Sequence, residues 1–176
     1  PRILTALWCI WERPAIDLFA THRNKKMEIY VSPYPDPAAY AVDALSIPWK
    51  GMLGYAFPPT RIVQSVLNKI MEEECIIVLI APNWPQQSWF PDLLELLIDF
   101  PIELPVWETM LRQPQSSIYH KNPGMMALHA WRLSKIKGYR KDFLKKLQVE
   151  WQELPRLPVE QSMRINGELS VIGVEK

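Results

Sequence analysis

Proline constrains the fold of this chain more than any other residue. Seventeen of the 176 residues are proline, and each lacks the amide hydrogen that a helix interior or a central strand needs. The residue before each proline is also driven out of the helical region. The chain must therefore fold from short elements in most places. Between the prolines, short apolar runs alternate with segments of helical periodicity.

The apolar runs indicate strands that are buried on both faces. Residues 15–20 are almost continuously apolar, and residues 75–81 contain five consecutive aliphatic side chains, from Ile76 to Ile80. Unbroken runs of this kind are typical of parallel sheets covered on both sides. We expect further strands at residues 27–32, 51–57, 102–104 and 125–133.

Helical spacing of apolar residues predicts helices at residues 2–12, 60–74 and 89–99. In the second, Thr60 is the expected N-cap. We also expect a short helix at residues 38–45, with Asp36 near its N-cap and Pro37 at its first position. The order of these elements predicts an α/β fold: a Rossmann-like layered sheet of mainly parallel strands with helices on both faces.

The domain organisation follows from where this pattern ends. Residues 1–134 form the predicted α/β domain, and residues 135–176 form a basic helix, at 135–150, and a C-terminal tail. Residues 111–124 are polar and indicate a loop. Residues 162–175 either pair as a hairpin around Asn166-Gly167 or are disordered. The chain begins without Met, so we expect it to be a piece of a longer polypeptide.

Composition excludes several functional classes. The net charge of +1 gives no strong overall field toward nucleic acid or acidic lipid. Cys9 and Cys75 lie in apolar runs, so we expect buried, reduced thiols without disulfides. No run is long enough to span a membrane, and the N-terminus lacks a secretory pattern. We therefore expect an intracellular protein, in the cytoplasm or the nucleus, with no membrane partner.

The candidate site lies where two predicted strands end. Ligands of α/β folds bind beyond the carboxyl ends of the strands, and Asp17 and Pro58-Pro59 both lie at such ends. A carboxylate in an apolar strand needs a partner. Asp17 either contacts a ligand or caps loop amides, and both interpretations stay open. Asp43 either faces the same pocket or lies on a helix surface.

Two neighbouring features could contact nucleic acid. The loop 22–26 is basic, and Arg23, Lys25 and Lys26 either meet phosphates or form a solvated turn. Trp84 and Trp89 follow the strongest strand and either stack on a base or belong to an aromatic cluster at the core edge. The histidines have no metal-ligand spacing, so no metal is expected. The alternative is a Mg²⁺-dependent, RNase H-like nuclease that uses Asp17, Asp36 and Asp43.

A set of short motifs extends along most of the chain. They are Ile16-Asp17-Leu18-Phe19-Ala20, Asn24, Tyr30, Asp36-Pro37, Asp43-Ala44, Trp49, Tyr55-Ala56-Phe57-Pro58-Pro59, Ala81-Pro82-Asn83-Trp84-Pro85, Trp89-Phe90-Pro91 and Ala130-Trp131-Arg132-Leu133-Ser134. As a set they resemble the region that follows the reverse transcriptase and RNase H in polyproteins of DIRS-type retrotransposons, which integrate with a tyrosine recombinase. The resemblance extends from about Trp11 to Ser134 and implies DNA or RNA, and other domains of the same polyprotein, as partners.

That region is in turn similar to phage-type Dam N6-adenine methyltransferases. The resemblance implies S-adenosylmethionine as cofactor, with Asp17 and Asp43 at the positions of the two cofactor-binding acids. The family's Asn-Pro-Pro-aromatic motif, which holds the flipped adenine, corresponds to Phe57-Pro58-Pro59-Thr60. Phe57 has no hydrogen-bond acceptor for the adenine amine, and Thr60 cannot stack on the base. We therefore expect a methyltransferase-like module with a degenerate catalytic motif. The alternative is an active S-adenosylmethionine-dependent DNA adenine methyltransferase with a reworked pocket.

Overall fold

The fold is described from a computed structural model, which covers residues 2–105 and 127–153. The chain divides into two units, Pro1–Phe143 and Leu144–Lys176. All seven strands of the described residues belong to the first unit. Its last residue, Phe143, is buried, and the Phe143 ring meets that of Phe100 edge to face at 5.2 Å between ring centres.

A seven-stranded sheet in the order β3-β2-β1-β4-β5-β7-β6 forms the centre of the first unit. The pairings β3–β2, β2–β1, β1–β4 and β4–β5 are parallel, whereas β7 runs antiparallel to both β5 and β6. This is an α/β, Rossmann-like layered fold with mainly parallel strands. The strands are β1 (Ile16–Asp17), β2 (Ile29–Ser32), β3 (Ala41–Val42), β4 (Leu53–Ala56), β5 (Ile76–Pro82), β6 (Ile102–Glu103) and β7 (Leu128–Leu133).

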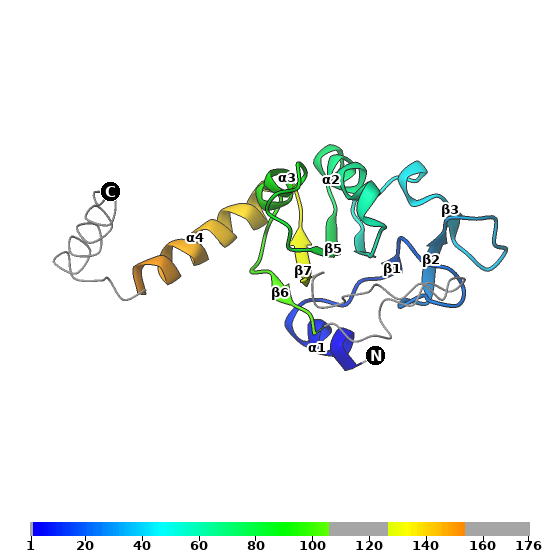
Figure 1. The fold of residues 1–176 in the computed structure, drawn as a ribbon, viewed down its shortest axis with the longest axis horizontal. Coiled ribbons are helices and arrows are strands. Elements are labelled where there is room, and N and C mark those ends of the chain that lie inside the picture. Colours follow the sequence, from blue (N-terminus) through cyan, green and yellow to red (C-terminus); the bar gives the residue numbers. More distant parts are fainter. Residues whose placement is uncertain (1, 106–126, 154–176) are drawn as a thin grey trace, which may run out of the picture. The chain divides into compact units, whose positions relative to one another are not determined.

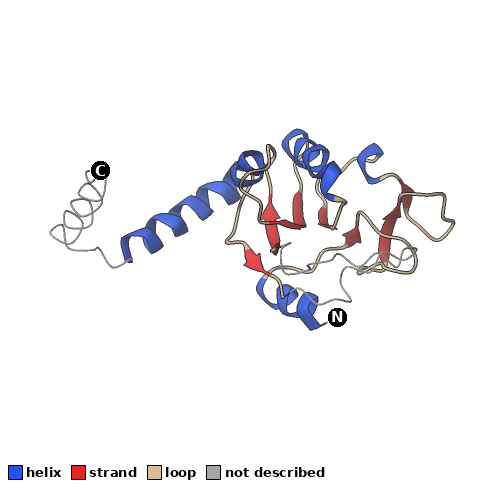
Figure 2. Ribbon diagram, viewed as in Figure 1, coloured by secondary structure: helices blue, strands red, loops and turns tan. Residues whose placement is uncertain are grey.

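Helices cover both faces of the sheet, as the sequence predicts (Figures 1 and 2). The helices α2 (Val63–Glu72) and α3 (Phe90–Glu95) pack on one face, where Leu67 and Leu93 join Ile77 and Leu79 in one buried cluster. The helix α1 (Arg2–Ile10) packs on the other, where Leu7 joins a second buried cluster. We call these the α2 face and the α1 face.

The alternation of side chains along each strand connects the two faces. In β5, Ile77 and Leu79 point to the α2 face, while Val78 and Ile80 point to the α1 face, as the period of two requires. Every one of these side chains is buried. The unbroken apolar sequence of β5 is therefore explained by burial on both sides.

Several expectations about local structure are wrong. Residues 38–45 do not form a helix: β3 is followed by the short 3-10 helix η1 (Ala44–Ser46). Thr60 is not an N-cap, because it is the first residue of the 3-10 helix η2 (Thr60–Ile62), which precedes α2 and has no side-chain cap. Cys9 is exposed, whereas Cys75 is buried; both are free thiols.

The remaining helix, α4 (Lys137–Glu153), begins close to where the basic helix was expected. Within the described residues, no helix has both the length and the apolar character to cross a membrane. The predicted loop at 111–124 and the predicted hairpin at 162–175 lie outside the described residues.

Candidate functional site

The candidate site lies at the topological switch point of the sheet, where the strand order reverses between β1 and β4. β1 and β4 are parallel neighbours, with Asp17 in register with Tyr55, and the chain proceeds outward from them to β2 on one side and β5 on the other. Ligands of open α/β sheets bind at this crevice. The carboxyl ends of both strands bring Asp17 and the segment Phe57-Pro58-Pro59 to one edge of the sheet, as the sequence predicts.

The carboxylate of Asp17 binds the backbone of the loop that follows it. Asp17 is 2% exposed. Its Oδ2 accepts a hydrogen bond from the amide of Lys26 at 2.8 Å, and its Oδ1 accepts one from the amide of Phe19 at 3.3 Å. Burial raises the pKa of Asp17, and these two bonds oppose the rise. Of the two interpretations of Asp17, these hydrogen bonds favour the second, in which the carboxylate caps loop amides.

The loop that Asp17 holds is further closed by its own side chains. Asn24 accepts hydrogen bonds at Oδ1 from the amide of Thr21 at 2.6 Å and from its hydroxyl at 3.1 Å. The amides of Asn24 and Lys25 both donate to the carbonyl of Thr21. The loop is thus a compact turn, and Arg23 and Lys26 are exposed on it.

Tyr30 connects this basic loop to the next one. The Nζ atom of Lys25 lies 5.0 Å from the centre of the Tyr30 ring, a cation–π distance, and His22 lies beside the same ring. The Tyr30 hydroxyl donates to Oδ2 of Asp36 at 2.7 Å. This bond raises the pKa of Tyr30 to about 12 and lowers that of Asp36. Asp36 also accepts from the amide of Ala38 and so caps a turn.

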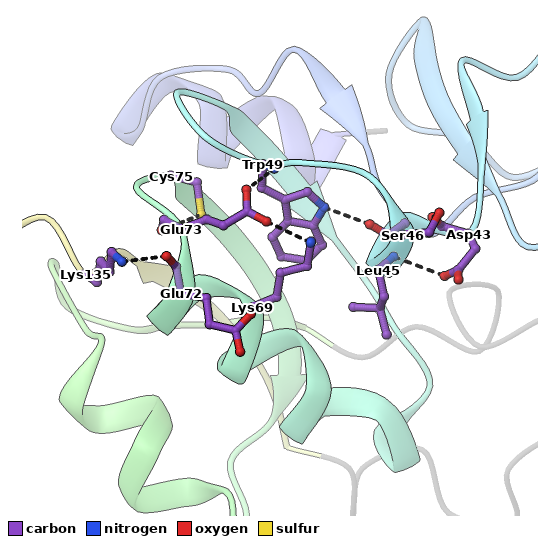
Figure 3. Close-up of polar contacts among 10 residues, drawn as sticks. Asp43, Leu45, Ser46, Trp49, Lys69, Glu72, Glu73, Cys75 and Lys135 are labelled. Atoms are coloured by element: carbon purple, nitrogen blue, oxygen red, sulfur yellow. Dashed lines mark hydrogen bonds and ion pairs between the residues drawn. The ribbon is translucent and has the colours of Figure 1, made fainter.

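Asp43 is not brought together with Asp17. It follows β3, which β2 separates from β1, and its side chain is exposed. Its Oδ1 accepts from the amide of Leu45 at 3.1 Å, so Asp43 caps η1 (Figure 3). Its φ of +60° is a left-handed conformation that few residues other than glycine adopt. Asp43 is therefore neither a helix-surface acid nor a neighbour of Asp17.

The segment after η1 is fixed by Trp49, which is fully buried. Its indole nitrogen donates to the carbonyl of Ala44 at 2.9 Å, and its amide donates to the Glu73 carboxylate (Figure 3). Glu73 also forms an ion pair with Lys69 at 2.8 Å. The hydrogen bond from Lys69 is the main cause of the lowered pKa of Glu73. These contacts hold the connection between β3 and β4 against α2.

The four residues that correspond to the adenine-binding motif lead from the end of β4 into η2. Phe57 is half-buried and packs against the cluster on the α1 face, and Pro58 is buried. Pro59 and Thr60 are exposed at the start of η2. Phe57 brings no acceptor to the edge of the sheet, as its side chain dictates.

The two tryptophans differ in exposure. Trp89 is 6% exposed and belongs to the buried cluster on the α2 face, where its ring lies 6.1 Å from that of Phe90. It is therefore a core residue and offers no open face for a base. Trp84 is half-buried beyond the end of β5.

The three acids of the nuclease alternative are dispersed. Asp17 is buried, whereas Asp36 binds Tyr30 and Asp43 caps η1. Among residues 2–105 and 127–153, no three His, Cys, Asp or Glu side chains are grouped so that they could hold a metal ion. The described part of the chain therefore does not support the nuclease.

Sequence reasoning missed two exposed aromatic residues on the loops around β2. Tyr34 is 66% exposed and Tyr40 is 68% exposed. The sequence signal for Tyr34 was Pro33-Tyr34-Pro35, because two flanking prolines exclude the helix or central strand that would bury the ring.

Comparison with known proteins adds no relative to these observations. No protein-family model matches the chain, and no curated protein matches it.

Proposed function

We propose that this chain is a methyltransferase-related domain of a DIRS-type retrotransposon polyprotein, that it has lost methyl transfer, and that it binds nucleic acid through the loop 22–26. The observation that carries the proposal is the pair of hydrogen bonds from the amides of Phe19 and Lys26 to Asp17. They make the acid at the end of β1 the anchor of a basic loop.

The order of the strands supports the fold that the resemblance implies. The classic doubly wound order is 3-2-1-4-5-6, and here the antiparallel strand β7 is inserted between β5 and β6. In such sheets ligands bind at the carboxyl ends of the central strands, where Asp17 lies.

The residues at the edge of the sheet do not fit the cofactor. In the family, S-adenosylmethionine is bound by two acids, but here both oxygens of buried Asp17 accept backbone hydrogen bonds and Asp43 lies beyond β2. Phe57 offers no acceptor for an adenine amine. These observations favour a module without methyl transfer over the active enzyme.

The basic loop favours nucleic acid as the partner. Arg23 and Lys26 are exposed, and the hydrogen bonds of Asp17 and Asn24 fix the backbone that carries them. A cationic loop with a preformed backbone binds phosphates without the cost of ordering that backbone. The resemblance to a retrotransposon polyprotein points the same way, since such polyproteins act on RNA and DNA.

The proposal is tested by measuring binding and methylation in the same sample. Purified protein is mixed with labelled S-adenosylmethionine and an adenine-containing duplex, and a gel-shift assay runs beside a methyl-incorporation assay. We expect a shifted complex and no incorporation above a protein-free blank. Incorporation that disappears in Asp17→Ala would establish the active enzyme instead. Absence of any shift, with duplex or with single strands, would overturn the nucleic-acid role.

A further inference from the structure

We propose that the preferred ligand of this module is single-stranded nucleic acid, with bases stacked on Tyr34 and Tyr40 and phosphates bound by the loop 22–26. This inference rests on the proposed nucleic-acid role and specifies its ligand. The two tyrosines belong to the segment between β2 and β3, whereas the basic loop lies between β1 and β2. The structure adds that both segments contact Tyr30.

Tyr30 brings the two loops together on one side of β2. His22 and Lys25 from the first loop lie against its ring, and Asp36 from the second loop binds its hydroxyl at 2.7 Å. Tyr34 precedes Asp36 in this second loop. The backbone amide of Tyr40 donates to the carbonyl of Tyr30 at 2.8 Å. The backbone segments that carry both exposed rings are thus linked to the residue on which the basic loop packs.

Exposure and rigidity make the two tyrosines suitable stacking surfaces. Tyr34 and Tyr40 are 66% and 68% exposed, the most exposed large apolar side chains of the described residues. Pro33 and Pro35 restrict the backbone on both sides of Tyr34, and its amide donates to the Ser32 hydroxyl at 3.2 Å. The backbone that carries this ring therefore needs little ordering when a base stacks on it.

The positive charge of the loop 22–26 favours a phosphate backbone over an acidic or apolar partner. Arg23, Lys25 and Lys26 give the first loop its positive charge. The carboxylate of Asp17 accepts from the Lys26 and Phe19 amides, and that of Asp36 is engaged by Tyr30 and by the amide of Ala38. The pKa of Asp36 is lowered, in lesser part by the charges of His22 and Lys25.

Stacking on exposed rings distinguishes single strands from duplexes. In a duplex the faces of the bases are covered by their neighbours, whereas unpaired bases can stack on aromatic side chains. Duplex DNA would use only the cations of loop 22–26. We therefore expect a single strand to bind more tightly than the duplex of the same sequence.

The test is fluorescence anisotropy with a labelled 12-nucleotide single strand, as DNA and as RNA, and with the matching duplex. We expect Tyr34→Ala and Tyr40→Ala each to weaken single-strand binding about tenfold and to leave duplex binding within twofold. Tyr34→Phe and Tyr40→Phe should bind like the wild type, because the stacking face remains. The control is Tyr139→Ala, another exposed tyrosine, on α4.

Three results would overturn the inference. If the tyrosine variants bind single strands like the wild type, or if duplex binds as tightly as single strand, the stacking platform fails while the nucleic-acid role remains. If the wild type binds neither ligand, both proposals fail together. Circular dichroism of each variant ensures that a loss of binding reflects the missing ring and not unfolding.

Discussion

The amide of Lys26 donates a hydrogen bond of 2.8 Å to the buried carboxylate of Asp17. One residue of this pair ends the first parallel strand at the switch point of the sheet, and the other ends the basic loop. The Asp17 carboxylate, which could bind a ligand, instead accepts hydrogen bonds from the backbone of the loop. The same contact carries both parts of the proposal that concern Asp17: the carboxylate is occupied, and the basic loop is held in place.

Replacing Asp17 with alanine should release the basic loop. The amides of Phe19 and Lys26 would lose their acceptor, and an unsatisfied buried amide costs about 1–3 kcal/mol. Hydrogen–deuterium exchange should show faster exchange at both amides in Asp17→Ala. The control is Asp43→Ala, which removes the acceptor of the Leu45 amide and places alanine at a left-handed φ but leaves both hydrogen bonds of Asp17 in place. Unchanged protection of Lys26 in Asp17→Ala would contradict the assigned role.

Asp17 and Glu73 should affect stability with opposite pH dependence. The pKa of Asp17 is raised by burial, so folding favours its protonated form. Its contribution to the free energy of unfolding is fully present below the ordinary value of 3.8 and is lost as pH rises through the raised folded pKa. Asp17→Asn should therefore gain stability relative to the wild type as pH rises across this range.

For Glu73 the sign is reversed, because its hydrogen bond with Lys69 lowers its pKa. Its contribution is present above the ordinary value of 4.5 and is lost as pH falls through the lower folded pKa. The wild type should lose its advantage over Glu73→Gln as the solution is acidified. Urea denaturation at a series of pH values measures both differences, and slopes of the same sign would show that one assignment is wrong.

Gly51 should resist substitution because of its backbone. It lies at φ +73°, where a side chain would meet open space, so that strain is the only penalty. Gly51→Ala should cost about 1–2 kcal/mol of folding free energy. The matched control is Gly138→Ala near the start of α4, where the added Cβ also meets nothing and alanine favours the helix. Thermal denaturation compares the two, and equal melting temperatures would contradict the prediction.

The sheet could be predicted from the sequence because its central strands are buried on both faces. The run from Ile76 to Ile80 has no polar break, and in β5 every residue of it from Ile77 onward is buried. The helix at 38–45 was wrongly expected because Asp36-Pro37 is typical of a helix start. There the backbone pairs with β2 instead: Tyr40 donates to Tyr30, and Asp43 to Ser32. Such tertiary pairing outweighs local propensity.

The site was only partly predictable for a similar reason. The strand-end positions of Asp17 and Phe57 follow from the order of the elements. The partner of Asp17 does not, since the amide of Lys26 comes within reach only when the whole loop closes. The left-handed conformation of Asp43 and the joining of two loops at Tyr30 also depend on contacts that no local pattern encodes.

The central claim is that the loop held by Asp17 binds phosphates. It is tested most directly by the affinity for a labelled oligonucleotide between 50 and 200 mM salt, a range over which phosphate contacts weaken strongly. The variant is Arg23→Glu/Lys26→Glu, and its control is Lys50→Glu/Lys137→Glu, whose exposed lysines lie at the opposite edge of the sheet, before β4 and after β7.

For a single strand, the account predicts that the logarithm of the wild-type affinity falls with a slope of about −2 against the logarithm of salt concentration, since each of three phosphate contacts adds about 0.7. The loop variant should bind at least about tenfold more weakly at the lowest salt and show a slope reduced by more than half. The control should behave as the wild type. Equal affinity and slope in the loop variant and the wild type would contradict the account.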